Sequence, residues 1–98
     1  MSAIVEFSIF PIDKGINLSS HVAKAVAIVK NSGVTYQFTP MGTIMEGDLG
    51  TLLDIVKECH DTMRQESDRV YINLKVDSRT GDSSRLEQKI RSVETKIK

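Results

Sequence analysis

Cysteine, proline, tryptophan and unbalanced charge are all scarce or absent in this sequence of 98 residues. It has one cysteine, two prolines and no tryptophan, and its 13 basic residues equal its 13 acidic residues in number. A single cysteine excludes an internal disulfide and a zinc site built from cysteines, and it fits a reducing compartment. The balanced charge gives no strong field that would attract nucleic acid or an anionic membrane, so we expect neither as a partner.

Long apolar runs are also missing. No apolar stretch approaches the roughly 20 residues that a membrane-spanning helix needs, and the first residues lack a basic region followed by an apolar stretch. We therefore expect a cytoplasmic protein. The length suits one domain over residues 1–98, and a chain this small gains stability by associating with other copies.

Four short segments have the pattern of strands. Residues 4–10, 34–39 and 69–77 alternate between apolar and polar side chains, which is typical of strands buried on one face. Residues 43–47 follow a Pro-Met-Gly break and end in glycine, which predicts a hairpin partner for the second strand. The apolar faces of the first and last strands are formed by Val5, Phe7 and Ile9, and by Val70, Ile72, Leu74 and Val76.

Three other segments repeat apolar residues at helical spacing. Asp48 is placed to cap the second of these helices, and Gly33 is placed to end the first, for which Asn17 or Ser19 is the expected cap. Ser84 and Glu87 form a capping-box pattern at the start of the third helix, expected over about residues 84–97. The three apolar stripes are Leu18, Val22, Ala25, Val26 and Val29; Leu49, Leu52, Leu53, Val56, Cys59 and Met63; and Leu86, Ile90, Val93 and Ile97.

This order of elements predicts an α+β fold of the ferredoxin-like β-α-β-β-α-β type, followed by a C-terminal helix. Right-handed crossovers place the first two helices on one face of an antiparallel four-stranded sheet and leave the other face open. The third helix has no obvious place on a face that two helices already cover. We expect it to pack against a neighbouring subunit or over a sheet edge.

Catalytic and metal-binding patterns are weak. Glu58, Cys59, His60 and Asp61 are consecutive on a helix, so they point in different directions and cannot all meet one metal ion. Neither a nucleophile-and-base arrangement nor a phosphate-binding glycine motif is visible, and the third strand lacks the aromatic residues of an RNA-binding sheet. We expect no catalytic residue, no metal, no cofactor and no enzymatic activity.

Polar residues on the predicted strands are the remaining candidates for function. Their side chains are able to converge around a small molecule, but the same residues also fit a solvated sheet face or a subunit interface lined by hydrogen bonds. These residues are Glu6, Ser8, Gln37, Thr43, Glu46, Asn73 and Lys75.

Residues 6–9 with Pro11, Tyr36, and residues 40–43 leading to Glu46-Gly47 form a pattern known from one family. In these residues the sequence resembles the small thiamine-binding proteins also known as the UPF0045 or DUF77 family. Asp68-Arg69-Val70, residues 75–79 and Ser92-Val93-Glu94 fit as well, so the likeness covers nearly the whole chain. The Met-Gly-Thr to Glu-Gly segment is its most specific part.

The resemblance implies a ferredoxin-like fold, dimers built by joining sheets, pairs of dimers forming tetramers, and binding of thiamine or its hydroxymethylpyrimidine part near subunit interfaces. Carboxylates and hydroxyls complement an aminopyrimidine edge, and apolar side chains suit its flat faces. We expect Ser8, Thr43 and Glu46 to make polar contacts. Strand alternation places Thr43 and Glu46 on opposite faces unless a bulge intervenes. Further candidate ligand-binding residues are Glu6, Tyr36, Met41 and Asn73.

These observations lead to two hypotheses. The first is a non-catalytic binding protein for thiamine or hydroxymethylpyrimidine, and it favours unphosphorylated ligands because no arginine or lysine cluster adjoins the Met-Gly-Thr segment. The second is a regulatory or self-association module with the same topology and no vitamin ligand.

Overall fold

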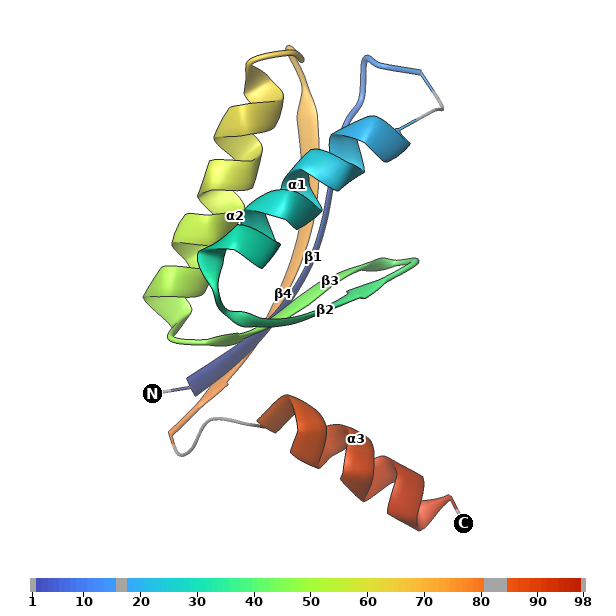
Figure 1. The fold of residues 1–98 in the computed structure, drawn as a ribbon, viewed down its shortest axis with the longest axis vertical. Coiled ribbons are helices and arrows are strands. Elements are labelled where there is room, and N and C mark those ends of the chain that lie inside the picture. The colour runs from blue at the N-terminus through green and yellow to red at the C-terminus, as the bar shows by residue number, and fades with distance from the viewer. Residues whose placement is uncertain (1, 16–17, 81–84, 98) are drawn as a thin grey trace.

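The computed structural model describes residues 2–15, 18–80 and 85–97, with only the backbone for 85–89. The elements follow the predicted order, with a four-stranded antiparallel sheet, two helices on one face and a third helix at the C-terminal end (Figure 1). This is the ferredoxin-like α+β fold. The elements are β1 (Ser2–Pro11), α1 (Ser19–Ser32), β2 (Thr35–Thr39), β3 (Gly42–Gly47), α2 (Leu49–Arg64), β4 (Val70–Arg79) and α3 (Arg85–Lys96).

The sheet has the strand order β2-β3-β1-β4, so β1 lies between β3 and β4. β1 pairs with β4 along its whole length, from Ser2–Arg79 to Pro11–Val70. β3 pairs with β1 only from Ala3–Gly47 to Phe7–Thr43. From Ser8 onward, β1 is therefore paired with β4 on one side and has no pairing with β3 on the other.

The core lies between the sheet and α2, with a smaller contribution from α1. Val5, Phe7 and Ile9 face it from β1, as the alternation predicts, and Met45 faces it from β3. α2 contributes five buried residues, whereas α1 contributes only Ala25 and Val29. The buried residues of α2 are Leu52, Ile55, Val56, Cys59 and Met63.

Helix ends confirm two predictions and correct a third. The Asp48 side chain caps α2 by accepting a hydrogen bond from Thr51 N–H at 3.1 Å, and Gly33 ends α1 in the left-handed region with φ of 83°. Ser19 as the cap of α1 is wrong, because the cap position is Leu18 and no side chain bonds there. Asn17 and the capping pair of Ser84 with Glu87 lie outside the described residues or side chains.

Two apolar assignments also change. Leu53 was assigned to the core, but it is 38% exposed, and Ile55 is buried in its place. Leu74 and Val76 share the helix-side face of β4 as predicted, yet both are more than two-fifths exposed because neither helix covers that end of the edge strand. The alternation thus predicts the face of a strand but not what covers it.

α3 lies apart from the two-layer body, beyond the end of β4 (Figure 1). Ile90 and Val93 on α3, and Ile97 directly after it, are exposed in the single chain. At the other end of the sheet, the segment after β1 is joined to the segment before β4. There the Asp13 carboxylate accepts hydrogen bonds from the Ser67 hydroxyl and from Asp68 N–H. Among the described residues, no helix is both long and apolar enough to cross a membrane.

Candidate ligand-binding site

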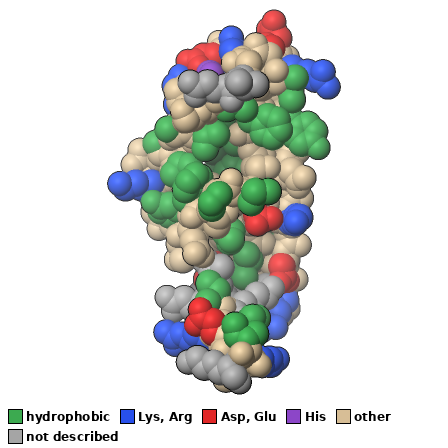
Figure 2. Space-filling model, turned by 90° about the vertical axis from the view of Figure 1, so that its right-hand side faces the viewer, with side chains coloured by type: hydrophobic (Ala, Val, Ile, Leu, Met, Phe, Trp, Pro, Cys, Tyr) green, Lys and Arg blue, Asp and Glu red, His purple; other side chains and the backbone are tan. Residues whose placement is uncertain are grey.

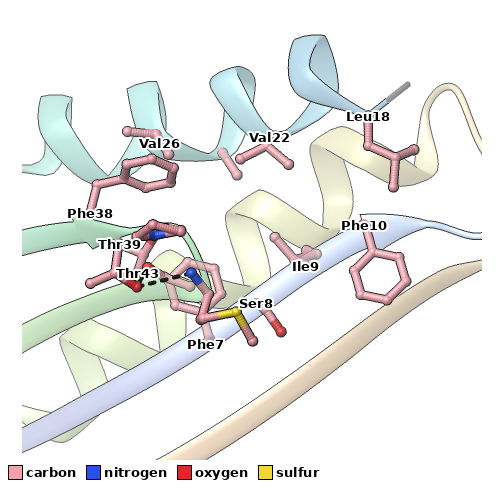
Figure 3. A pocket seen from close by; sticks show the side chains of 14 residues that line it. Phe7, Ser8, Ile9, Phe10, Leu18, Val22, Val26, Phe38, Thr39 and Thr43 are labelled. Carbon is pink, nitrogen blue, oxygen red and sulfur yellow. Dashed lines mark hydrogen bonds between the residues drawn. The ribbon is translucent and has the colours of Figure 1, made fainter. Parts of the chain in front are cut away.

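An apolar pocket lies between the first half of α1, the tip of the β2–β3 hairpin and the end of β1 (Figure 3). Its volume is about 340 Å³. Figure 2 views the side of the molecule that is on the right in Figure 1, where the tip of the β2–β3 hairpin lies, and shows hydrophobic side chains gathered around a hollow. The side chains and backbone that line it come from Phe7, Ser8, Ile9, Phe10, Leu18, Val22, Ala25, Val26, Phe38, Thr39, Pro40, Met41, Gly42 and Thr43.

The pocket exists because β3 is shorter than β1. Beyond the Phe7–Thr43 pair no strand lies beside β1 on that side, so the first turns of α1 have no complete sheet beneath them. Val22 and Val26 are only half-buried as a result, although they share the apolar stripe of α1 with the fully buried Val29. In Figure 3 the Phe38 ring lies close to Val26 and closes one side of the space.

The hairpin tip is held by short local contacts. The Thr39 hydroxyl donates to the Gly42 carbonyl at 2.9 Å and accepts from Met41 N–H at 3.2 Å. A Cβ at Gly42 would lie 2.9 Å from the Phe7 carbonyl oxygen, closer than real Cβ atoms come, so this position needs glycine. These contacts fix where the tip stands relative to β1.

A second, polar pocket of about 330 Å³ lies on the opposite, helix-free face of the sheet. The pairing of β1 with β4 places Glu6 opposite Lys75 and Ser8 opposite Asn73, which brings these four side chains together. Lys75 Nζ is 3.6 Å from Glu6 Oε1. Ser8 and Met41 line both pockets, so the two spaces adjoin at the hairpin tip.

The structure brings together five of the seven predicted ligand residues. Ser8, Met41 and Thr43 line the apolar pocket, and Glu6 and Asn73 join Ser8 and Met41 in the polar one. Tyr36 and Glu46 line neither. Tyr36 packs against the core from β2, and Glu46 is only 6% exposed on the helix-free face. Thr43 and Glu46 lie on opposite faces, as the alternation predicts.

The residues that the sequence did not single out are mainly those of α1. Leu18, Val22 and Val26 fit a core stripe by their spacing, and nothing in the sequence distinguishes a stripe that packs from one that lines a cavity. Lys75 was noted only as a member of the polar set. Its position opposite Glu6 follows from the register of β1 with β4, which a single sequence does not give.

The reactive side chains lie outside both pockets. Cys59 is 0% exposed in the core, and burial raises the pKa of its thiol to about 11, which leaves it protonated and unreactive. His21 Nδ1 lies 3.5 Å from Glu66 Oε2, and Lys24 also pairs with Glu66, which lowers the pKa of that carboxyl. Among the described residues no cluster of histidine, cysteine and carboxylate side chains is suited to a metal ion.

Comparison with known proteins assigns the family. The model of a family described as thiamine-binding protein matches residues 5–94. This chain belongs to the thiamine-binding protein family. The match includes both pockets and the four strands that form them.

Relatives support this membership at the level of sequence and fold. The UPF0045 protein MJ1052 of Methanocaldococcus jannaschii is 36% identical over 90 residues, which cover 92% of this chain and 90% of the relative. A UPF0045 protein of Methanothermobacter thermautotrophicus is 43% identical over 83 residues, covering 83% and 84% of the two chains.

Solved structures of related proteins have the same fold. The crystal structure of MJ1052 superposes with a TM-score of 0.88 at 34% identity, covering 95% of this chain and 96% of the other. That of TM0486 from Thermotoga maritima gives 0.83 at 22% identity, with coverage of 95% and 99%, and at this identity the likeness concerns the fold alone.

Proposed function

We propose that this protein binds thiamine or its hydroxymethylpyrimidine part in the apolar pocket beneath α1, without catalysis of its own. The observation that carries the proposal is the pocket itself, because the family name indicates a small heteroaromatic ligand and the apolar walls of this space would suit the faces of such a ring. TM0486, which shares the fold, has itself been connected with thiamine biosynthesis or salvage.

The size and lining of the pocket suit such a ligand. Small-molecule sites usually measure ~300–1,000 Å³ and combine apolar walls with a few placed polar groups. At about 340 Å³, this pocket has room for one small ring system. Phe38 and Val26 offer apolar surface for the ring faces, and the Thr43 hydroxyl offers a hydrogen-bond partner at the rim.

Calorimetric titration with thiamine and with hydroxymethylpyrimidine tests the proposal. Val26→Phe fills the pocket from α1 and should weaken binding at least tenfold, because the added ring occupies the ligand's space. Ala27→Phe adds a ring at the neighbouring exposed position and should bind as the wild type does. Thermal unfolding of both variants checks that they are folded.

Two results would contradict the proposal. If calorimetry detects no heat when the folded wild type is titrated with either compound at millimolar concentration, thiamine and hydroxymethylpyrimidine are excluded as ligands. Equal binding by Val26→Phe and Ala27→Phe removes this pocket as the site.

Thr43 permits a finer test of the polar contact. Thr43→Val keeps the shape of this 5% exposed side chain and deletes only its hydroxyl, so a loss of ligand affinity of about fivefold to tenfold is expected. Thr35→Val makes the same change on β2, at an exposed position that faces the other side of the sheet, and should change nothing.

Assembly into a homo-oligomer, with a pair of dimers as the expected form, is the second part of the proposal. Ile90, Val93 and Ile97 on α3 are exposed at spacings of three and four residues, and Leu74 and Val76 are exposed on the edge strand β4. Apolar side chains gathered in this way favour contact with another copy. The same surfaces favour the alternative function, a self-association module without a vitamin ligand.

Val93→Glu separates ligand binding from assembly. It should lower the mass measured by sedimentation because it places a charge in the apolar stripe, while Thr95→Glu, on the opposite side of α3, should not. Wild-type mass for Val93→Glu would exclude α3 from the assembly contact. A self-association module would respond to Val93→Glu but give no heat with thiamine.

A further inference from the structure

Two pockets on opposite faces of one sheet share two lining residues, Ser8 and Met41. We propose that they are the two ends of a single site that passes around the tip of the β2–β3 hairpin, and that Glu6 at its polar end selects against phosphate esters. This inference rests on the proposed function and adds to it a second contact region and a basis for ligand choice.

The truncated strand β3 makes such a passage possible. A continuous sheet separates its two faces, but here β3 ends at Gly42, and the Ser8–Pro11 part of β1 is paired with a strand on the β4 side alone. The position of a Gly42 Cβ would be 3.8 Å from Ser8 Cβ, so Ser8 lies directly at the end of the hairpin. A ligand held beneath α1 therefore has a short route past Ser8 to the helix-free face.

The polar end has a definite chemical character. The side chains of Glu6 and Lys75 face each other at 3.6 Å, and they are 41% and 76% exposed. Glu6 is thus the more buried partner, whereas Lys75 extends further into solvent and can move away. With Ser8 and Asn73 beside them, the site offers a carboxylate, a hydroxyl and an amide.

These groups suit one end of a two-part ligand. A ring with apolar faces fits the pocket beneath α1, and a cationic or neutral end that carries a hydroxyl fits beside Glu6. Thiamine has this form, with a pyrimidine ring at one end and a thiazolium with a hydroxyethyl group at the other. A phosphate on that hydroxyethyl group would meet the Glu6 carboxylate, and Lys75 already pairs with Glu6.

Calorimetry with thiamine, thiamine monophosphate and hydroxymethylpyrimidine tests the inference on the wild type and on Glu6→Gln. The wild type should prefer thiamine to the monophosphate at least tenfold. Glu6→Gln should reduce this preference at least tenfold, because it removes the repulsion and frees Lys75 for the phosphate. Hydroxymethylpyrimidine, which occupies only the apolar end, should bind both proteins equally.

Glu58→Gln is the matched control, since Glu58 is an exposed carboxylate on α2 and lies outside both ends of the site. It should keep the wild-type preference. Equal binding of thiamine and its monophosphate by the wild type, or an unchanged preference in Glu6→Gln, overturns the two-ended site while leaving thiamine binding in place. If the wild type binds none of the three compounds, the proposed function is overturned as well.

Discussion

The two helices that cover the sheet differ in how many side chains they bury in the core. α2 buries five side chains in the core, among them the fully buried Leu52 and Cys59. α1 buries only Ala25 and Val29, and its first turns stand over a pocket. The difference shows how one sheet face divides into a packed half under α2, which holds the fold together, and a hollow half under α1, which is available to a ligand.

The division arises from strand length rather than from helix composition. Both helices carry an apolar stripe, but α2 runs beside the β1–β4 pair, which continues along the whole of β1, whereas the first half of α1 lies beyond the end of β3, which pairs with β1 only as far as Phe7. Apolar side chains stabilise a fold only where they have a surface to pack against. The same kind of residue therefore has different roles in the two halves.

The largest expected effect is a difference in the free energy of unfolding between substitutions in the packed half and in the hollow half. Leu52→Ala removes a fully buried side chain from the packed half and should lower the free energy of unfolding by about 2–5 kcal/mol. Val22→Ala, in the hollow half, should cost clearly less, on the order of 1 kcal/mol, because Val22 already borders an open space. Urea denaturation of both variants measures the difference, and equal losses would refute the division.

Thiol labelling compares how readily a reagent reaches side chains in the same two halves. Cys59 is fully buried and its pKa is raised to about 11, so roughly a hundredfold less thiolate is present at pH 8 than for a thiol with its usual pKa of 9.0. A second thiol introduced by Val26→Cys borders the pocket and should react at least a hundredfold faster with iodoacetamide. Mass spectrometry of the two peptides gives both rates within one protein. Similar rates would mean that the packed half opens as readily as the hollow one.

Gly42→Ala sharpens the comparison at the point where the halves meet. The new methyl group would clash with the Phe7 carbonyl, and we expect a loss of about 1–3 kcal/mol in the free energy of unfolding together with weaker thiamine binding. Gly50→Ala is the control, because its nearest contact is the Asp48 carboxylate oxygen that caps α2, at 3.3 Å rather than 2.9 Å from a backbone carbonyl, and alanine favours helix. It should be neutral or slightly stabilising.

The smallest effect concerns the loop that leads into α1. Hydrogen bonds from Ser67 and from Asp68 N–H lower the pKa of Asp13 below its usual 3.8. The folded state thus favours the ionised carboxylate, so the stability that Asp13 contributes is present above pH 3.8 and is lost as the pH falls through the lowered pKa. Asp13→Asn should reduce the change in urea midpoint between pH 6 and pH 3. Asp54→Asn, at an exposed carboxylate on α2, should leave that change close to the wild-type value.

The sequence was sufficient to predict the faces of β1, the cap of α2 and the order of the elements, because each depends on local alternation or on a single hydrogen bond. It was insufficient where the outcome depends on neighbours in space. Leu53 and Ile55 lie at opposite edges of the apolar stripe of α2, and the spacing does not decide which edge packs against the core. Leu74 is exposed because no helix reaches it. The pocket depends on where β3 ends beside β1, which only the register reveals.

The unequal lengths of β1 and β3 have a further consequence for evolution of the site. Along a strand, alternate residues direct their main-chain N–H and C=O groups to opposite edges, so part of the Ser8–Pro11 segment directs such groups toward the side where β3 is missing. Substitution does not remove main-chain groups. Recognition through them would persist while the surrounding side chains diverged, and relatives would be free to exchange ligands without rebuilding the scaffold.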